Sequence, residues 1–150
     1  MKKIFLFIGA MFAVLNLSAQ NYKVGDIYEA NGKKGIVFEV SADGQHGKII
    51  SLTEPKGVMT WAKAMECGKQ LKDGWYLPSR AELLTLFEVV EAVAPVAKQQ
   101  GDKLVVDPNG FYWATDEFGA DFAWIVSLKY GSNGGSYKGN GFHIRAISKF

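Results

Sequence analysis

The side chains best suited to binding a ligand gather in one glycine-rich segment, YGSNGGSYKGNG, at residues 130–141. This segment displays Tyr130, Asn133, Tyr137, Lys138 and Asn140 among five glycines. Tyrosine offers a rigid ring with a polar hydroxyl, and asparagine and serine offer adaptable hydrogen bonds. Such residues suit sugar hydroxyls as well as protein surfaces. The pattern predicts a ligand-binding loop, with a plain solvated hairpin loop as the competing interpretation.

Residues that commonly carry catalysis or bind metals are scarce. Cys67 is the only cysteine, which excludes an internal disulfide and a multi-cysteine zinc site, and His46 and His143 are the only histidines. The adjacent acids Asp116 and Glu117 would point to opposite faces of a strand, so they are poorly placed as an acid/base pair. No phosphate-binding glycine loop, HExxH helix or GxSxG motif occurs. We therefore expect a protein that is not an enzyme, with no metal ligand and no cofactor.

The composition is that of one globular domain. The chain has 150 residues, of which 48% are hydrophobic and 21% are charged. The formal net charge is +2, and removal of Lys2 and Lys3 with an export signal would leave 15 basic and 15 acidic residues. Because a neutral domain without a basic run lacks the charge pattern of nucleic-acid binding, we expect no nucleic-acid partner.

Residues 1–19, MKKIFLFIGAMFAVLNLSA, have the layout of a secretory signal peptide: two lysines, an apolar run and a small-residue cleavage site. The apolar run from Ile4 to Leu15 is shorter than the roughly 20 residues that span a bilayer, which argues against a membrane anchor. Gln20 stands where a lipoprotein would carry its acylated cysteine. We therefore expect an exported protein, periplasmic or extracellular, that is not inserted in the membrane after signal cleavage.

Residues 20–56 are expected to form β-hairpins. Asn31-Gly32 is a two-residue turn signal, residues 35–40 are rich in branched and aromatic side chains, and residues 48–52 form a returning strand. The sequence leaves open whether these strands pack on the rest of the chain.

Two helices are expected to follow. Thr60 caps the first, whose apolar residues recur at spacings of three and four until Asp73-Gly74 stops it. Ser79 and Glu82 form a capping box at the start of the second, which Pro95 is expected to end or kink.

The last part of the chain returns to strands. They are expected at residues 111–115, 122–129 and 142–148, after a loop at residues 98–110. The strand at 122–129 is apolar on both faces and is therefore expected to be central. This order of elements predicts an α+β fold in which two helices flank a mainly antiparallel sheet, preceded by the N-terminal hairpins.

Four motifs, in order, resemble the Lcl C-terminal-like domain family, relatives of the fibrobacter-type major paralogous domains of exported bacterial proteins. Residues 60–86 carry Trp, Ala, Cys and Leu, then Gly-Trp-x-Leu-Pro-Ser-x-x-Glu-Leu. The motifs YWAT at 112–115, AWIV at 123–126 and IRAI at 144–147 resemble the later family motifs. We therefore assign residues 57–150 to this domain and residues 20–56 to a lead-in segment.

The resemblance implies a C-type-lectin-like fold, in which a disulfide often joins the first helix to the last strand. Here Cys67 holds the helix position and Ala146 the strand position, so half of the bridge is missing. The tripeptide Asp107-Pro108-Asn109 is similar to the Glu-Pro-Asn motif of animal lectins. It precedes the strand with Tyr112 and Trp113 instead of following it, so we interpret it as a turn.

By analogy with this fold, we expect recognition of a glycan or extracellular polymer through residues 130–141. The alternative is a structural or protein-binding subunit of a bacterial surface assembly. A sugar site should show one exposed aromatic ring with amide and acid neighbours in a concavity, whereas a protein-binding face should show a wider apolar patch. Arg145, in the last expected strand, is either a paired structural arginine or a ligand contact.

Overall fold

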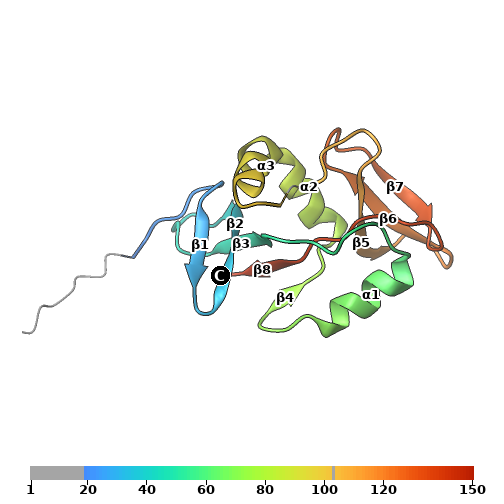
Figure 1. Ribbon diagram of the computed structural model, residues 1–150, viewed down its shortest axis with the longest axis horizontal. Coiled ribbons are helices and arrows are strands. Elements are labelled where there is room, and N and C mark those ends of the chain that lie inside the picture. Colours follow the sequence, from blue (N-terminus) through green and yellow to red (C-terminus); the bar gives the residue numbers. More distant parts are fainter. Residues whose placement is uncertain (1–18, 103) are drawn as a thin grey trace, which may run out of the picture.

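The computed structural model describes residues 19–102 and 104–150, in which three helices and two antiparallel sheets form an α+β protein (Figure 1). The expected signal peptide, residues 1–19, lies outside the described residues except for Ala19. No helix in the described part is long and apolar enough to cross a bilayer. The helices are α1 (Trp61–Gln70), α2 (Arg80–Glu88) and α3 (Val90–Gln99). The strands are β1 (Ile27–Ala30), β2 (Lys33–Val40), β3 (Gly47–Ser51), β4 (Trp75–Tyr76), β5 (Phe111–Glu117), β6 (Phe122–Ser127), β7 (Asn133–Tyr137) and β8 (Ile147–Lys149).

The larger sheet has the strand order β1-β2-β3-β8-β4, and every neighbouring pair is antiparallel. The expected turn at Asn31 and Gly32 joins β1 to β2, with φ angles of 53° and 74°, as a tight hairpin turn requires. β3 pairs with β8, the last strand of the chain. The lead-in strands and the C-terminal strand therefore belong to one sheet, a point that the sequence left open.

The smaller sheet has the order β5-β6-β7, which confirms the prediction of a central strand within residues 122–129. The expected loop at residues 130–141 is wrong in part, because it contains β7, which pairs with β6 from Asn133 to Tyr137. Glycine and asparagine have low strand propensity, but pairing with a central strand overrides that local preference.

The expectation of one sheet with a closing strand at residues 142–148 is also wrong in part. Phe142 forms only an isolated bridge to Met59, and His143 forms one to Tyr112. Regular pairing begins again at Ile147, where β8 enters the larger sheet. The segment after β7 therefore crosses from one sheet to the other, which divides the strands into two sheets.

Both expected helix starts are confirmed. The Thr60 hydroxyl accepts a hydrogen bond from the backbone N–H of Lys63 at the start of α1. At the start of α2 the capping box is complete: the Glu82 N–H donates to the Ser79 hydroxyl at 3.2 Å, and the Ser79 N–H donates to the Glu82 carboxylate at 2.9 Å. These caps satisfy backbone donors that the first helical turn leaves without partners.

The second expected helix is two helices. α2 ends at Glu88, and α3 continues through Pro95 to Gln99, so Pro95 does not end the helix, which was one of the two expected effects. The break falls at Val89, whose φ of −118° and ψ of 11° lie outside the helical range. Proline fits the helical φ and removes one backbone donor, and the burial of Val93 and Ala97 on either side of Pro95 offsets that loss.

The helices connect the two sheets through a shared core. α2 packs against β2, β5 and β6, and α3 packs against β2, so residues of both sheets enter one buried cluster. α1 packs against β5 from the other side, where Ala64, Trp113 and Ala123 form a second cluster. Figure 1 shows the result, with β1 and β7 at opposite ends of the molecule.

A buried arginine ties the segment after β3 to the core. Arg145 is 1% exposed, and its guanidinium donates to the Ser51 carbonyl through Nε (2.9 Å) and Nη2 (2.8 Å). Its Nη1 donates to the Glu54 carboxylate at 3.1 Å, and the Tyr112 hydroxyl donates to the same carboxylate at 2.6 Å. Arg145 is thus a paired structural arginine, the first of the two interpretations from the sequence.

Replacing Glu54 with alanine should destabilise the fold by about 3–5 kcal/mol, because it removes the carboxylate to which the buried Arg145 guanidinium donates and leaves the more distant Asp102 carboxylate, at 3.9 Å. Urea unfolding of the variant and the wild type measures this difference. Glu29→Ala is the matched control, since the pair of Glu29 with Lys34 is exposed and should contribute at most about 1 kcal/mol. Equal losses in the two variants would contradict the assigned role of Glu54.

Stability should also fall at alkaline pH. Burial and the adjacent Glu54 carboxylate raise the pKa of Tyr112 well above its ordinary value, and burial together with Glu82 raises the pKa of Tyr76. Above pH ~10 the unfolded chain loses these protons more readily than the folded chain, so folding becomes less favourable as the pH rises. In an alkaline titration followed by tyrosinate absorbance, the wild type should show two tyrosines that ionise only when the chain unfolds. The Tyr112→Phe variant should show one. Ionisation of Tyr112 in the folded protein near pH ~10 would contradict this assignment.

Candidate functional site

Aromatic side chains gather on one face of the smaller sheet. Phe122 and Trp124 alternate along β6, opposite Tyr137 and Gly135 of β7. Phe118, directly after β5, packs edge-on against Trp124 with 4.8 Å between ring centroids, and the Phe122 and Tyr137 rings are 6.3 Å apart. Phe118 and Tyr137 are each 55% exposed, and Phe122 is 44% exposed. We call Phe118, Phe122, Trp124 and Tyr137 the aromatic face.

Arg80, the first residue of α2, is held against the aromatic face. Its guanidinium carbon lies 3.9 Å from the centre of the Trp124 ring, and its Nε donates to the side-chain oxygen of Asn133 at 2.8 Å. The Arg80 backbone N–H donates to the Asp116 carboxylate at 2.5 Å, which places a negative charge at the helix N-terminus, where the helix dipole favours it. A cation and an amide are therefore fixed beside the rings.

The structure separates the five residues predicted as ligand contacts. Tyr137 belongs to the aromatic face, and Asn133 lies on the same side of β7 next to Arg80. Tyr130 is 61% exposed but lies in the turn before β7, at the opposite end of that strand from Tyr137. Lys138 and Asn140 follow β7 and contact residues on the other side of the sheet.

The contacts of Lys138 are structural. Its ammonium lies 4.5 Å from the centre of the Trp61 ring of α1 and donates to the Glu117 carboxylate and the Ala120 carbonyl, each at 2.8 Å. The Asn140 amide donates to the Ser136 hydroxyl at 3.1 Å. These bonds connect the end of β7 to α1 and to the β5–β6 turn, so Lys138 and Asn140 are less available for a ligand than Tyr137.

Phe118, Phe122, Trp124 and Arg80 were not predicted as contacts from the sequence. The alternation of Phe122 and Trp124 along β6 was the available signal, but the strand was interpreted as buried on both faces. In the structure the face of β6 that carries Phe122 and Trp124 is covered only in part. The helix α2 packs on the half of this face that carries the buried Val126. The other half carries the exposed Phe122.

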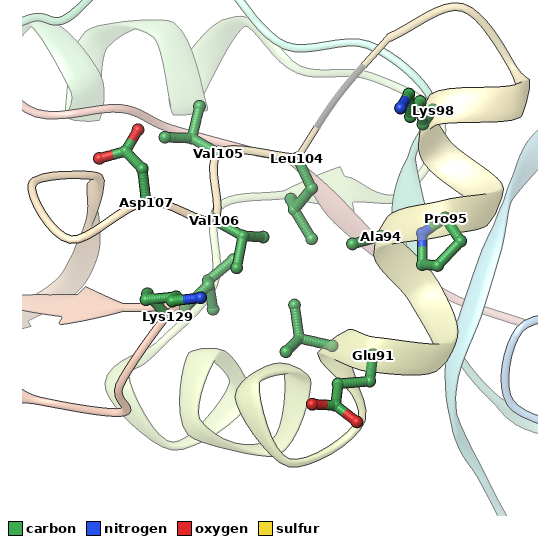
Figure 2. A pocket seen from close by; sticks show the side chains of 11 residues that line it. Glu91, Ala94, Pro95, Lys98, Leu104, Val105, Val106, Asp107 and Lys129 are labelled. Atoms are coloured by element: carbon green, nitrogen blue, oxygen red, sulfur yellow. The ribbon is translucent and has the colours of Figure 1, made fainter.

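A separate cavity of about 700 Å³ lies between α3, residues 104–107 and residues 128–129, which directly follow β6 (Figure 2). Its lining is largely apolar, and four charged residues surround it: Glu91, Lys98, Asp107 and Lys129. Two acids and two lysines leave no net charge that would select an ionic ligand. None of the predicted contact residues lines this cavity.

A second cavity, of about 390 Å³, has both Cys67 of α1 and Ala146 in its lining. Cys67 is a free, half-buried thiol. The two residues therefore face the same space, as the family resemblance implies for the two ends of the missing bridge.

Residues 19–102 and 104–150 contain no group of three His, Cys, Asp or Glu side chains arranged to hold a metal ion. The adjacent acids of β5 serve different elements, since Asp116 accepts from α2 and Glu117 pairs with Lys138. Asp107-Pro108-Asn109 is a turn, as predicted: the Asn109 N–H donates to the Asp107 carboxylate at 2.9 Å and the Gly110 N–H to the Asp107 carbonyl at 3.1 Å.

Fold and site together define a small α+β domain with an open aromatic face on one of two antiparallel sheets. The chain belongs to the Lcl C-terminal domain family, whose family model matches residues 32–148. The match begins in the turn between β1 and β2, so it includes β2 and β3 as well as the later motifs. No curated protein matches the chain.

Introducing a cysteine at Ala146 should complete the bridge to Cys67. The Ala146→Cys chain should lose two hydrogens by non-reducing mass analysis after export, and the closed loop should stabilise the fold by about 2–4 kcal/mol. Ala146→Ser is the control, because it adds a polar atom at the same place without a thiol. Two free thiols in exported Ala146→Cys would show that α1 and the segment before β8 are not in disulfide geometry.

Proposed function

We propose that this protein is an exported, non-catalytic recognition module with a C-type-lectin-like fold, and that it binds a glycan or another extracellular polymer through the aromatic face. The observation that carries the proposal is the exposure of three neighbouring rings, Phe118, Phe122 and Tyr137, on an open sheet. A cluster of exposed large apolar side chains on a small domain commonly marks a surface that binds a partner.

The chemistry of the face suits a sugar polymer. The C–H faces of a sugar ring are apolar and can pack on aromatic rings, while its hydroxyls need hydrogen-bond partners when water is displaced. Tyr137 offers a ring and a hydroxyl together. Arg80 and Asn133 hold a guanidinium and an amide in fixed positions beside the rings.

The shape of the face favours an extended ligand. The three exposed rings line neither the cavity beside α3 nor the one beside Cys67. A small ligand is usually enclosed in a pocket, whereas a polymer can lie across an open surface. We therefore place the polymer along the sheet and not in either cavity.

The other parts of the proposal rest on the sequence. Export rests on the signal-like residues 1–19. The C-type-lectin-like fold rests on the family resemblance and agrees with α1 and α2 lying on the two sides of the smaller sheet. The absence of catalysis rests on the scarcity of cysteine and histidine.

A second candidate function is that of a protein-binding or structural subunit of a bacterial surface assembly. The specific observation in its favour is the width of the aromatic face. Three exposed rings form a broader apolar patch than the single ring in a concavity expected of a sugar site.

Binding to soluble polysaccharides should depend on Tyr137 and Phe122. Tyr137→Ala and Phe122→Ala should each weaken binding at least tenfold, or roughly 1.4 kcal/mol, because each removes a ring from the face. A screen of the exported chain against immobilised polysaccharides, with and without calcium, provides the measurement. Tyr130→Ala is the matched control, since Tyr130 is at least as exposed as Tyr137 and Phe122 but lies outside the face.

Loss of binding in Tyr130→Ala with full binding in Tyr137→Ala would reject the aromatic face as the site. Binding to no polysaccharide would reject the glycan proposal and favour the protein-binding function. A comparison of wild type and Phe122→Ala against surface proteins would then be the next experiment.

A further inference from the structure

The outer side of β7 carries backbone groups that the chain itself does not use. The Lys138 N–H donates to the Asp121 carbonyl, and the Ser127 N–H donates to the Ser132 carbonyl. These two bonds fix which residues between 132 and 138 direct their backbone N–H and C=O groups toward β6 and which direct them outward. Gly134 and Ser136 accordingly direct their backbone groups toward β6, whereas Asn133, Gly135 and Tyr137 direct theirs outward. These three residues are exposed, and the one partner of their outward groups among described residues is the Asn140 N–H, which donates to the Tyr137 carbonyl.

β7 also lacks the features that commonly protect an edge strand. Residues 133–137 contain no proline and no charged side chain, and their pairing with β6 is regular. The other edges in the described residues differ. β1 carries Glu29, β4 has two residues, and β5 is covered by bonds from the Trp113 N–H to the His143 carbonyl and from the Thr115 N–H to the Pro78 carbonyl.

We propose that β7 pairs antiparallel with β7 of a second copy of this chain, about a two-fold axis at Gly135. The outward groups are symmetric about this residue, so Gly135 would face Gly135 and Asn133 would face Tyr137 of the second copy. Each strand offers donors and acceptors to the other, as a two-fold interface requires, and the Tyr137 carbonyl can accept a second hydrogen bond beside the one from Asn140. The two three-stranded sheets then form one sheet of six strands.

The side chains near the axis favour this pairing. The Phe118 ring lies directly over Gly135, where a side chain would collide with it. Because position 135 carries no side chain, the Phe118 rings of two copies can approach across the axis and bury apolar surface that is 55% exposed in one copy. No charged side chain within residues 133–137 opposes itself across the axis.

Pairing would also join two aromatic faces into one longer surface. The use of that surface for a polymer rests on the proposed function, whereas the pairing itself does not. The two proposals therefore fail separately: polymer binding by a chain that stays monomeric would reject only the pairing, and a dimer that binds no polymer would reject only the function.

A mixture of two cysteine variants tests the pairing and its register. In a Cys67→Ser background, Asn133→Cys and Tyr137→Cys chains of different tagged mass are mixed under mild oxidation. Opposed residues of a hydrogen-bonded pair have Cα atoms about 5.5 Å apart, within disulfide range. The disulfide-linked heterodimer formed in the mixture should be at least tenfold more abundant than the disulfide-linked homodimer that either variant forms alone. Asn133→Cys mixed with Ser136→Cys is the control and should give no such enrichment, and an equal yield in both mixtures would overturn the proposal.

The mass of the chain in solution is the second measurement. Light scattering of the exported wild-type chain should give twice the chain mass. Gly135→Pro should give the monomer mass, because proline removes an outward N–H that β6 does not use and its ring displaces the Phe118 ring from the axis. Gly134→Ala is the control and should remain a dimer, since there is open space at that position. Near-UV circular dichroism reports whether Gly135→Pro is folded, and the cysteine mixtures leave Gly135 intact. A monomeric wild type at every concentration would overturn the proposal.

Discussion

A guanidinium that is 1% exposed is stable only when its donors are paired, and the pairing of Arg145 determines how distant parts of this chain come together. It donates hydrogen bonds to the Ser51 carbonyl at the end of β3 and to the Glu54 carboxylate, which also accepts from Tyr112 of β5. One charge thus connects the larger sheet, the segment before α1 and the smaller sheet. These contacts are noncovalent, and Cys67, as a free thiol, adds no disulfide to them.

The position of β5 also determines where the residues of the aromatic face lie. β5 pairs with β6, and β6 pairs with β7, while Asp116 at the end of β5 receives the first N–H of α2 and so places Arg80 on the Trp124 ring. On the other side of the sheet, Lys138 connects β7 to Trp61 of α1. Because both sides are fixed, the exposed rings would need little ordering to bind the proposed polymer, which would lower the entropic cost of association.

Local features could be predicted from the sequence, and features that depend on distant pairing could not. The Asn31-Gly32 turn and the Ser79–Glu82 capping box each depend on residues close together in the sequence, and both predictions are confirmed. The formation of β7 and the division into two sheets depend on which segments pack beside them. Local residue preferences alone therefore led to the prediction of a loop at residues 130–141 and of a single sheet. Of the five contact residues predicted from residue type, Tyr137 and Asn133 lie on the side of the sheet that carries the aromatic face, whereas Tyr130, Lys138 and Asn140 do not. Phe118 and Phe122 emerge as candidates only once it is known which half of β6 the helix α2 covers.

The central claim is that the aromatic face binds an extracellular polymer. The most direct measurement is an amide chemical-shift map of the isotopically labelled chain, titrated with a soluble polysaccharide that it binds. We predict shifts concentrated in residues 118–124 and 133–137, together with the side-chain signal of Arg80. Shifts confined instead to α3 and residues 104–107 would place the ligand in the 700 Å³ cavity and contradict the claim.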